Sequence, residues 1–333
     1  MFPKFLVVIG TSAGGLQALQ LLLPQLTLDL DAAFLIVMHM SRKGTGTGIL
    51  NKLQQYSSLP CRFGASGNLI EKGVIYLAPP NHHMLVEAGS IITGKGAPEN
   101  RWRPSINNLF RSAAATYNSR VIGIVLTGLL DDGTAGMRAI KSAGGTTIIQ
   151  DPAEAEYPDM PLSVKQSIAV DHTAVLENIG HLLVELCSRP APAPVEVPSI
   201  VQLETALDRR VSTRIDHLAQ FEKINVSCPD CGGGLHVTQA ENPRRYRCHV
   251  GHSYTDKDLI VRMSEVMENT LWIALRMMEE KRFLLSNLMA KYEDKSYKAT
   301  GITLYGERVA EMDIHIENLK GLIFTANQTD KQD

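Results

Sequence analysis

The chain has 333 residues, of which 44% are hydrophobic and 20% are charged, and its formal net charge is −2. This composition excludes a disordered chain, and the lack of a basic excess argues against a nucleic-acid-binding protein. The length predicts two or three domains. The first apolar run is short and no cleavage site follows it, and no stretch of about 18 apolar residues occurs, so we expect a cytoplasmic protein without membrane insertion.

Short apolar segments alternate with helical patterns through the first 187 residues. The predicted strands are Phe5–Ile9, Phe34–Met38, Val74–Ala78, Val121–Leu126 and Thr146–Gln150, and the predicted helices span about 15–25, 45–56, 105–117, 133–144 and 174–188. This alternation predicts an α/β fold, a doubly wound and mainly parallel sheet with helices on both faces. Met84–Val86 and Ile91–Thr93, separated by four residues, are expected to form a hairpin added to that sheet.

A glycine-rich motif, G-T-S-A-G-G, follows the first predicted strand and contains Ser12. A serine there lies at the carboxyl end of a parallel strand, where α/β sheets bind ligands, and the following helix offers free N–H groups to an oxyanion. The G-x-S-x-G spacing is similar to the nucleophile elbow of hydrolases. The alternative is a phosphate-binding loop, but neither glycine-rich nucleotide pattern is matched.

Two further strand ends carry groups that could act with Ser12. His39 ends the second predicted strand, about 5 Å from its neighbour in a sheet, and Asp131-Asp132-Gly133 follows the Val121–Leu126 strand. One of these acids could orient the imidazole of His39. Taken alone, His39 could be a structural histidine and the acid a helix N-cap. Three strand ends that supply Ser, His and Asp to one edge favour a hydrolase.

Several motifs together resemble the catalytic domain of the CheB chemotaxis methylesterases. They occur in the family's order and cover roughly residues 4–188: Gly10–Gly15, His39-Met40, Leu77-Ala78-Pro79 through His83-Met84, Arg101-Trp102-Arg103-Pro104-Ser105, and Leu126–Met137. The resemblance implies a protein-glutamate methylesterase that acts on chemoreceptor helices, and often also a glutamine deamidase. It places the triad on Ser12, His39 and Asp132 and the oxyanion contacts on the backbone near Ala13 and Leu129.

The resemblance also implies partners and regulation. A methylated chemoreceptor-type protein is the expected substrate, and a separate response regulator or a methyltransferase is a further expected partner. Arg101 and Arg103 are candidates for recognising an acidic receptor helix, and their alternative role is to stabilise a loop. Family members usually carry an N-terminal receiver domain, whereas the resemblance here starts at about residue 4.

Three positions depart from the family's L-T-G-M-G-N-D-G segment, the first being Leu129 in place of methionine. Leu130 replaces a glycine and Asp131 replaces an asparagine. A second carboxylate beside the triad can raise the pKa of its neighbours. These changes leave open a non-enzymatic alternative, a CheB-like signalling adaptor that acts through its C-terminal helices.

A second region follows a proline-rich stretch at 189–198, which we interpret as a stiff linker. Residues 199–225 are predicted as a helical connector, with a helix over about 199–222, and residues 226–254 as a small zinc-ribbon-like module. Cysteines at 228, 231 and 248 and a histidine at 252 have the spacing C-x2-C-x16-C-x3-H, which predicts a structural Zn²⁺ site rather than disulfides. His249 and, less directly, His236 are rival fourth ligands, and a redox C-x-x-C is the alternative. No cofactor is expected for catalysis.

Residues 255–333 carry two helical patterns with a turn near 297–303. The apolar positions alternate at spacings of three and four: Met267, Leu271, Ala274, Met278, Leu285 and Leu288 in the first pattern, and Tyr305, Val309, Met312, Ile316, Leu319 and Ile323 in the second. Such patterns predict an antiparallel helical hairpin. The two helices are expected to pack on each other, and the alternative is a coiled-coil docking surface for a partner or a second copy.

Overall fold

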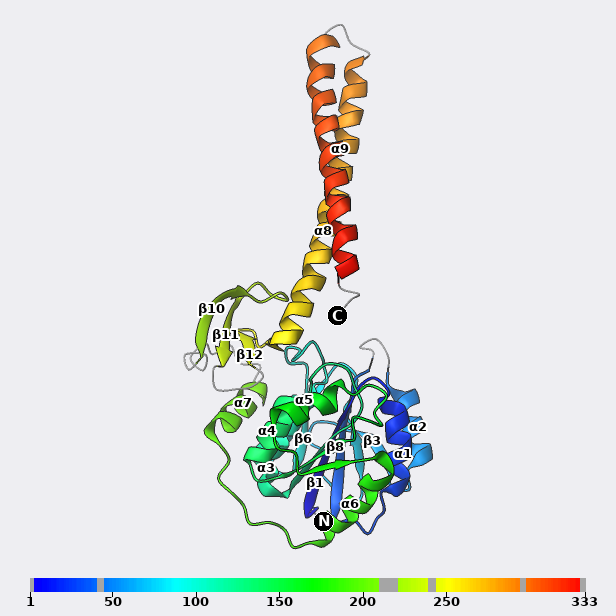
Figure 1. The fold of residues 1–333 in the computed structure, drawn as a ribbon, viewed down its shortest axis with the longest axis vertical. Helices are drawn as coiled ribbons and strands as arrows, with labels where there is room; N and C mark the ends of the chain where they lie inside the picture. Colours follow the sequence, from blue (N-terminus) through cyan, green and yellow to red (C-terminus); the bar gives the residue numbers. More distant parts are fainter. Residues whose placement is uncertain (1–2, 41–44, 210–220, 239–243, 294–297, 330–333) are drawn as a thin grey trace. The chain divides into compact units, whose positions relative to one another are not determined.

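The computed structural model describes residues 3–40, 45–209, 221–238, 244–293 and 298–329 (Figure 1). The chain divides into two compact units, Met1–Leu259 and Ile260–Asp333. The first unit contains the large sheet, the proline-rich stretch and the cysteine-rich module. Among the described residues, no helix combines the length and the apolar character that a membrane span needs.

A parallel sheet of seven strands forms the centre of the first unit. Its strand order is β3-β4-β2-β1-β7-β8-β9, and every neighbouring pair is parallel. The strands are β1 (Phe5–Thr11), β2 (Ala32–Met38), β3 (Cys61–Phe63), β4 (Ile75–Leu77), β7 (Val121–Val125), β8 (Thr146–Gln150) and β9 (His172–Ala174). Because β1 lies between β2 and β7, the strand order reverses at β1, which is where open α/β sheets form their binding crevice.

Helices cover both faces of this sheet, and each face has its own apolar cluster. The helices are α1 (Gly15–Leu22), α2 (Thr47–Tyr56), α3 (Ile106–Tyr117), α4 (Thr134–Ser142), α5 (Asp159–Ser167) and α6 (Leu176–Ser188). Helices α1, α2 and α6 contribute to one cluster, and α3, α4 and α5 contribute to the other. The predicted fold class, a doubly wound parallel sheet with helices on both faces, is therefore confirmed.

Some local predictions were wrong or incomplete. The hairpin, β5 (His83–Glu87) and β6 (Ser90–Gly94), forms a separate two-stranded sheet. Its turn is only Ala88-Gly89, both with positive φ, which is the tight geometry that matches the twist of a hairpin. The edge strands β3 and β9 are three residues each and too short to give an apolar pattern. Helix α5 has Pro161 in its first turn, which concealed it in the sequence.

The proline-rich stretch contains no helix or strand and contacts the segment that precedes β7. The Val195 N–H donates to Asn118 Oδ1 at 2.8 Å, and the Ser119 hydroxyl donates to the Ala193 carbonyl at 2.9 Å. These contacts fix the stretch on the surface that precedes β7.

The cysteine-rich module is an antiparallel four-stranded sheet that follows helix α7 (Ser199–Arg209). Its strands are β10 (Glu222–Ser227), β11 (Gly234–Thr238), β12 (Arg245–Cys248) and β13 (Ser253–Thr255). The expectation of a helix reaching 222, and of a helical connector reaching 225, is wrong at its end because Glu222–Ser227 pairs with β11. The predicted residues 210–220 lie outside the described residues.

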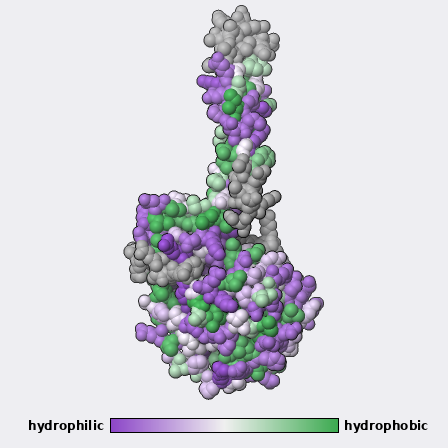
Figure 2. Space-filling view, viewed as in Figure 1, coloured by the Kyte–Doolittle hydropathy of each residue, from purple (hydrophilic) through white to green (hydrophobic). Residues whose placement is uncertain are grey.

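The second unit contains most of α8 (Asp256–Glu293) and all of α9 (Lys298–Thr329). Leu275, Ile316, Leu319 and Ile323 are buried between the two helices, and Arg282 pairs with Asp313 at 2.9 Å. The expected turn is misplaced, since residues 298–303 are helical and 294–297 lie outside the described residues. Two seam positions, Met267 and Leu288, are exposed, and Figure 2 shows apolar residues interspersed with hydrophilic ones along these helices.

Candidate active site and metal centre

Three side chains from three strand ends meet at the carboxyl edge of the sheet. Ser12 follows β1, His39 follows β2, and Asp132 follows β7. His39 Nδ1 lies 3.0 Å from Ser12 Oγ, and His39 Nε2 lies 2.9 Å from Asp132 Oδ2. The imidazole therefore faces the serine with Nδ1, the reverse of the serine-protease arrangement. Either ring nitrogen can accept a proton when the other carries one, so the chemistry is unaffected.

The loop after β7 approaches Ser12 closely because it contains glycine. The Ser12 N–H donates to the Thr127 carbonyl at 3.1 Å, which ties the two loops together. A β-carbon at Gly128 would lie 2.9 Å from Ser12 Cβ and 2.1 Å from Met160 Sδ, so no side chain fits there. Glycine at 128 is thus required for the serine and the aspartate to share one edge.

Asp132 is buried, and its carboxylate accepts several hydrogen bonds. Besides His39, its carboxylate accepts from the Ser105 hydroxyl at 3.1 Å and the Ile106 N–H at 2.8 Å, and also from the N–H groups of Asn107 and Gly133. Ile106 and Asn107 begin α3, whose N-terminus carries a partial positive charge. These donors fix the orientation of the carboxylate towards the imidazole.

The indole of Trp102 covers the imidazole of His39, a contact that the sequence analysis missed. The ring centroids lie 4.1 Å apart and the planes differ by 9°. Only 2% of the His39 side chain is exposed to solvent. The one signal in the sequence is the position of Trp102 within the R-W-R-P-S motif, which does not reveal what the indole contacts.

Two backbone N–H groups are the candidates for binding an oxyanion. Within the part of the chain that the structure describes, the N–H groups of Ala13 and Leu129 have no hydrogen-bond acceptor. The residues directly before them differ in this respect. The Ser12 N–H donates to the Thr127 carbonyl, and the Gly128 N–H donates to the Tyr157 carbonyl at 2.9 Å. An oxyanion role for these two N–H groups stays a prediction.

The two candidate arginines lie on the loop that precedes α3. Arg103 donates from Nε to Asn81 Oδ1 at 2.9 Å and from Nη1 to the Gly96 carbonyl at 2.8 Å. Arg101 has φ 68° and occupies the left-handed region. A role in recognising substrate stays a prediction for both residues, and the contacts of Arg103 also fit the alternative of a loop-stabilising residue.

Asp131 and Asp258 form a pair of buried carboxyls next to the triad. Burial raises the pKa of Asp131, and burial together with the neighbouring Asp131 charge raises the pKa of Asp258 to about 8. Asp258 lies in the first turn of α8, where its backbone N–H donates to Thr255 Oγ1 at 3.4 Å. Asp131, which replaces the family's asparagine, therefore faces a second acid, Asp258, at the start of α8.

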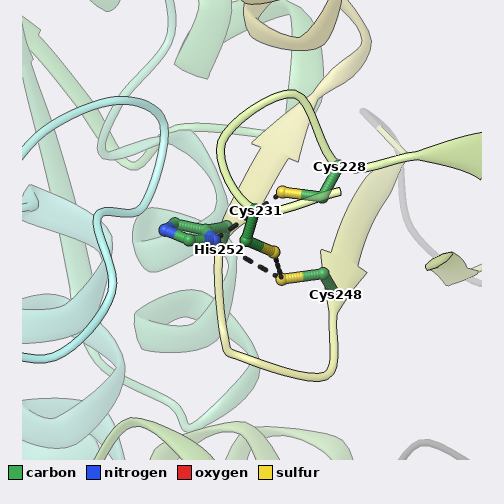
Figure 3. Close-up of side chains that lie close together, drawn as sticks. All are labelled: Cys228, Cys231, Cys248 and His252. Atoms are coloured by element: carbon green, nitrogen blue, oxygen red, sulfur yellow. Dashed lines mark hydrogen bonds between the residues drawn. The ribbon is translucent and has the colours of Figure 1, made fainter. Parts of the chain in front are cut away.

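The three cysteines and His252 converge in the module (Figure 3). Their ligand atoms lie within 4.8 Å of one another, with Cys231 Sγ 3.6 Å from Cys248 Sγ and His252 Nδ1 3.5 Å from Cys248 Sγ. Tetrahedral zinc with Zn–S bonds of about 2.3 Å separates its sulfurs by roughly 3.7 Å, so this donor set fits the ion. His252 joins the cluster, and neither His249 nor His236 does.

Comparison with known proteins identifies the family. The CheB methylesterase family model matches residues 7–183. This chain belongs to the CheB methylesterase family. A putative protein-glutamate methylesterase/protein-glutamine glutaminase of Leptospira interrogans is 35% identical over 181 residues, which cover 54% of this chain and 93% of that protein. These findings confirm the expected family and class of carboxylic ester hydrolase.

Two further comparisons delimit the similarity. The CheB methylesterase catalytic domain of Thermotoga maritima superposes with a TM-score of 0.52 and 30% identity, over 55% of this chain and 98% of that one. A protein-glutamate methylesterase/protein-glutamine glutaminase of Symbiobacterium thermophilum is 36% identical over 54% of this chain, but the match spans only 49% of that protein. The similarity is therefore one of catalytic domains, and the cysteine-rich module and helical pair lie outside it.

Proposed function

We propose that this chain hydrolyses glutamate γ-methyl esters on a methylated chemoreceptor-type protein, with Ser12 as nucleophile, His39 as general base and Asp132 as its orienting acid. The observation that carries the proposal is the hydrogen-bonded line from Ser12 Oγ through His39 to Asp132 at the switch point of the sheet. A serine beside an oriented imidazole is the arrangement that activates a hydroxyl for acyl transfer.

The two contacts of His39 support the following proton path. Asp132 accepts the Nε2–H of His39, so the Nδ1 lone pair faces the Ser12 hydroxyl. Ser12 Oγ attacks the γ-carbonyl carbon while its proton passes to Nδ1, and the imidazolium is stabilised by Asp132. The same proton then goes to the departing methoxide, which leaves as methanol. Water, deprotonated by His39, hydrolyses the acyl-enzyme and restores the serine.

The tetrahedral intermediate needs donors at its oxyanion. The free N–H groups of Ala13 and Leu129 supply them from the two loops that meet at Ser12. The same site accepts a glutamine amide, because ammonia can replace methanol as the leaving group once His39 Nδ1–H protonates it. Glutaminase activity, which the names of the relatives include, is thus chemically compatible with this triad.

The cluster of Cys228, Cys231, Cys248 and His252 is proposed to bind a structural Zn²⁺. Four protein ligands complete a tetrahedral shell and leave no position for substrate. The ion would supply folding free energy to the module, and catalysis needs only side-chain and backbone groups of the large sheet.

The partner proteins are proposals as well. A methylated receptor helix would present its ester to Ser12, with Arg101 or Arg103 near acidic neighbours of the ester. A separate response regulator or methyltransferase would act through the parts of the chain that the CheB similarity does not cover.

The test is release of labelled methanol from membranes that contain methyl-labelled chemoreceptors. The full chain should release methanol, and Ser12→Ala should lower the rate by at least about a thousandfold with unchanged fold and metal content. Release by neither protein, with the receptors shown to be substrates for another methylesterase, would contradict the proposal and favour the adaptor alternative. Equal release by both would show that Ser12 is not the nucleophile.

A further inference from the structure

The turn that carries Trp102 is bound on both sides, by the catalytic domain and by the metal module. It is a two-residue hairpin in which Glu99 and Trp102 exchange both backbone hydrogen bonds, at 3.2 and 2.9 Å. The two residues between them, Asn100 and Arg101, have φ of 48° and 68°. Non-glycine residues in the left-handed region are strained, and such a turn persists when its surroundings hold it.

Strand β13 of the module supplies that support through the backbone. The Asn100 N–H donates to the Ser253 carbonyl at 2.8 Å, and Glu99 forms a parallel bridge with Ser253. Ser253 is buried and directly follows His252, one of the four clustered ligands. The strained turn is therefore hydrogen-bonded to the residue next to the metal centre.

A buried network of ion pairs holds the same turn through its side chain. Glu99 pairs with Arg111 of α3 at 2.9 Å and with Arg245 of β12 at 2.6 Å. Burial would raise the pKa of the Glu99 carboxyl, yet the two guanidiniums hold that pKa well below its usual range. Three charged side chains complete the network: Glu204 and Asp208 of α7 and Arg247 of β12. Removal of any partner leaves a buried charge uncompensated, so the contacts are strongly cooperative.

Two of the four candidate metal ligands, Cys248 and His252, lie at the turn of the strand pair that makes these contacts. Strand β12 ends at Cys248, whose N–H donates to the His252 carbonyl at 3.0 Å. Strand β13 begins at Ser253, the residue directly after His252. Arg247 precedes one ligand and Ser253 follows another. An ion bound there fixes the register in which Arg245, Arg247 and Ser253 face the turn.

At its other end the turn contacts the triad twice. Trp102 stacks on His39, and Ser105, three residues later, donates to Asp132. We propose that the metal module positions the triad: metal binding orders the β12–β13 pair, which holds the Glu99–Trp102 turn so that the Trp102 indole keeps the His39 imidazole aligned between Ser12 and Asp132. The inference deepens the proposed esterase function and rests on it for its kinetic part only.

Trp102 is thereby a positioning residue, and its substitution has a defined signature. Loss of a stacked aromatic contact that aligns the base in the transition state should lower kcat and kcat/KM together by about three- to tenfold, with KM unchanged. Trp102→Phe keeps a ring on His39 and should retain most of the rate, whereas Trp102→Ala should not.

The coupling to the metal is tested first without substrate. The chain contains two tryptophans, so the full-length Trp272→Phe variant reports Trp102 alone. Indole emission depends on the groups in contact with the ring, so removal of zinc by a chelator should change the Trp102 emission, and added zinc should restore the starting emission. In a Trp272→Phe, His39→Ala background the emission should differ from the start and be insensitive to zinc. Unchanged Trp102 emission on zinc removal would overturn the inference.

A kinetic cycle then asks whether the metal acts through Trp102. In the full chain, zinc removal should lower kcat/KM by the same three- to tenfold as Trp102→Ala, and zinc removal from Trp102→Ala should have no further effect. Losses that multiply would show independent roles and overturn the inference. A zinc-dependent emission change in a chain that releases no methanol would refute the esterase proposal and still support the coupling.

Discussion

The seven-stranded sheet is covered by two large apolar clusters, whereas the apolar cluster of the four-stranded sheet has five buried members among the described residues: Cys228, Leu235, Cys248, Tyr254 and Leu259. Two of those five are candidate metal ligands. The large sheet can therefore fold on the free energy of apolar burial, and the module depends on its ligands and on the buried ion pairs that join it to α3 and α7. The two regions thus differ in the source of their stability: apolar burial in the large sheet, and metal ligands and ion pairs in the module.

Removal of the metal should have the largest effect on stability, and among the strands it should destabilise only those of the module. Structural zinc in small domains supplies roughly 10 kcal/mol or more of apparent binding free energy, far above what the small module core provides. A chelator, or Cys228→Ser, should increase hydrogen exchange across β10–β13 while β1, β2 and β7 stay protected. Cys61→Ser is the matched control, because Cys61 lies in β3 outside the cluster. Loss of protection in the large sheet would contradict the comparison.

A cavity in the large sheet should produce the converse result. Phe34 of β2 is fully buried in the apolar cluster shared with α1 and α6. Phe34→Ala should lower the free energy of unfolding by about 3–5 kcal/mol, measured by urea denaturation, with zinc content unchanged. Leu28→Ala, at a residue that is 65% exposed, should change it by less than about 0.5 kcal/mol. Equal effects of the two substitutions would mean that the apolar clusters are not the source of stability.

Features that neighbouring residues determine could be predicted from the sequence, whereas contacts between residues far apart in the chain could not. Ser12, His39 and Asp132 each follow a strand that its own apolar run identifies, and parallel strands bring their ends to one edge. The four clustered ligands were likewise evident from local spacing. The contact of Trp102 with His39 was not, because it depends on a turn that bonds to Ser253, about 150 residues later in the chain.

The same limit explains the errors in secondary structure. The helical connector was predicted to reach residue 225 and so overlapped most of β10, Glu222–Ser227, which instead forms a strand paired with β11. The role of Asp131 was equally hidden, since the acid that faces it, Asp258, lies at the start of α8. Predictions from one sequence fail where a residue's state is set by a partner that no local pattern marks.

The pair of Asp131 and Asp258 offers a test of the contact between the module and the catalytic loop. The pKa of Asp258 is raised from 3.8 to about 8, so between these values the folded state holds a proton that the unfolded state releases. Stability should therefore fall as pH rises through this window, by up to about 1.4 kcal/mol per pH unit, and level off above about pH 8.

Asp258→Asn should flatten that decline, measured by urea unfolding between about pH 5 and pH 8. Asp131→Asn, which restores the family's asparagine, should flatten the decline only in part, because it removes the charge that Asp258 faces while the burial that raises the Asp258 pKa remains. A decline that keeps its full slope in both variants would show that the two carboxyls do not share a proton.

The smallest expected effect concerns Leu130, which occupies the position of the family's glycine. Its φ is 66°, a conformation that costs a residue with a β-carbon about 1–2 kcal/mol and costs glycine nothing. Leu130→Gly should raise the free energy of unfolding by about 0.5–1 kcal/mol, because the extra flexibility of the unfolded chain offsets part of the relief. Leu129→Gly is the matched control: its φ is not positive, so the same substitution should destabilise by a similar amount. If both glycine variants lose stability, the leucine at 130 stabilises the loop by contacts that outweigh the strain, and the catalytic loop would resemble the module in relying on its surroundings.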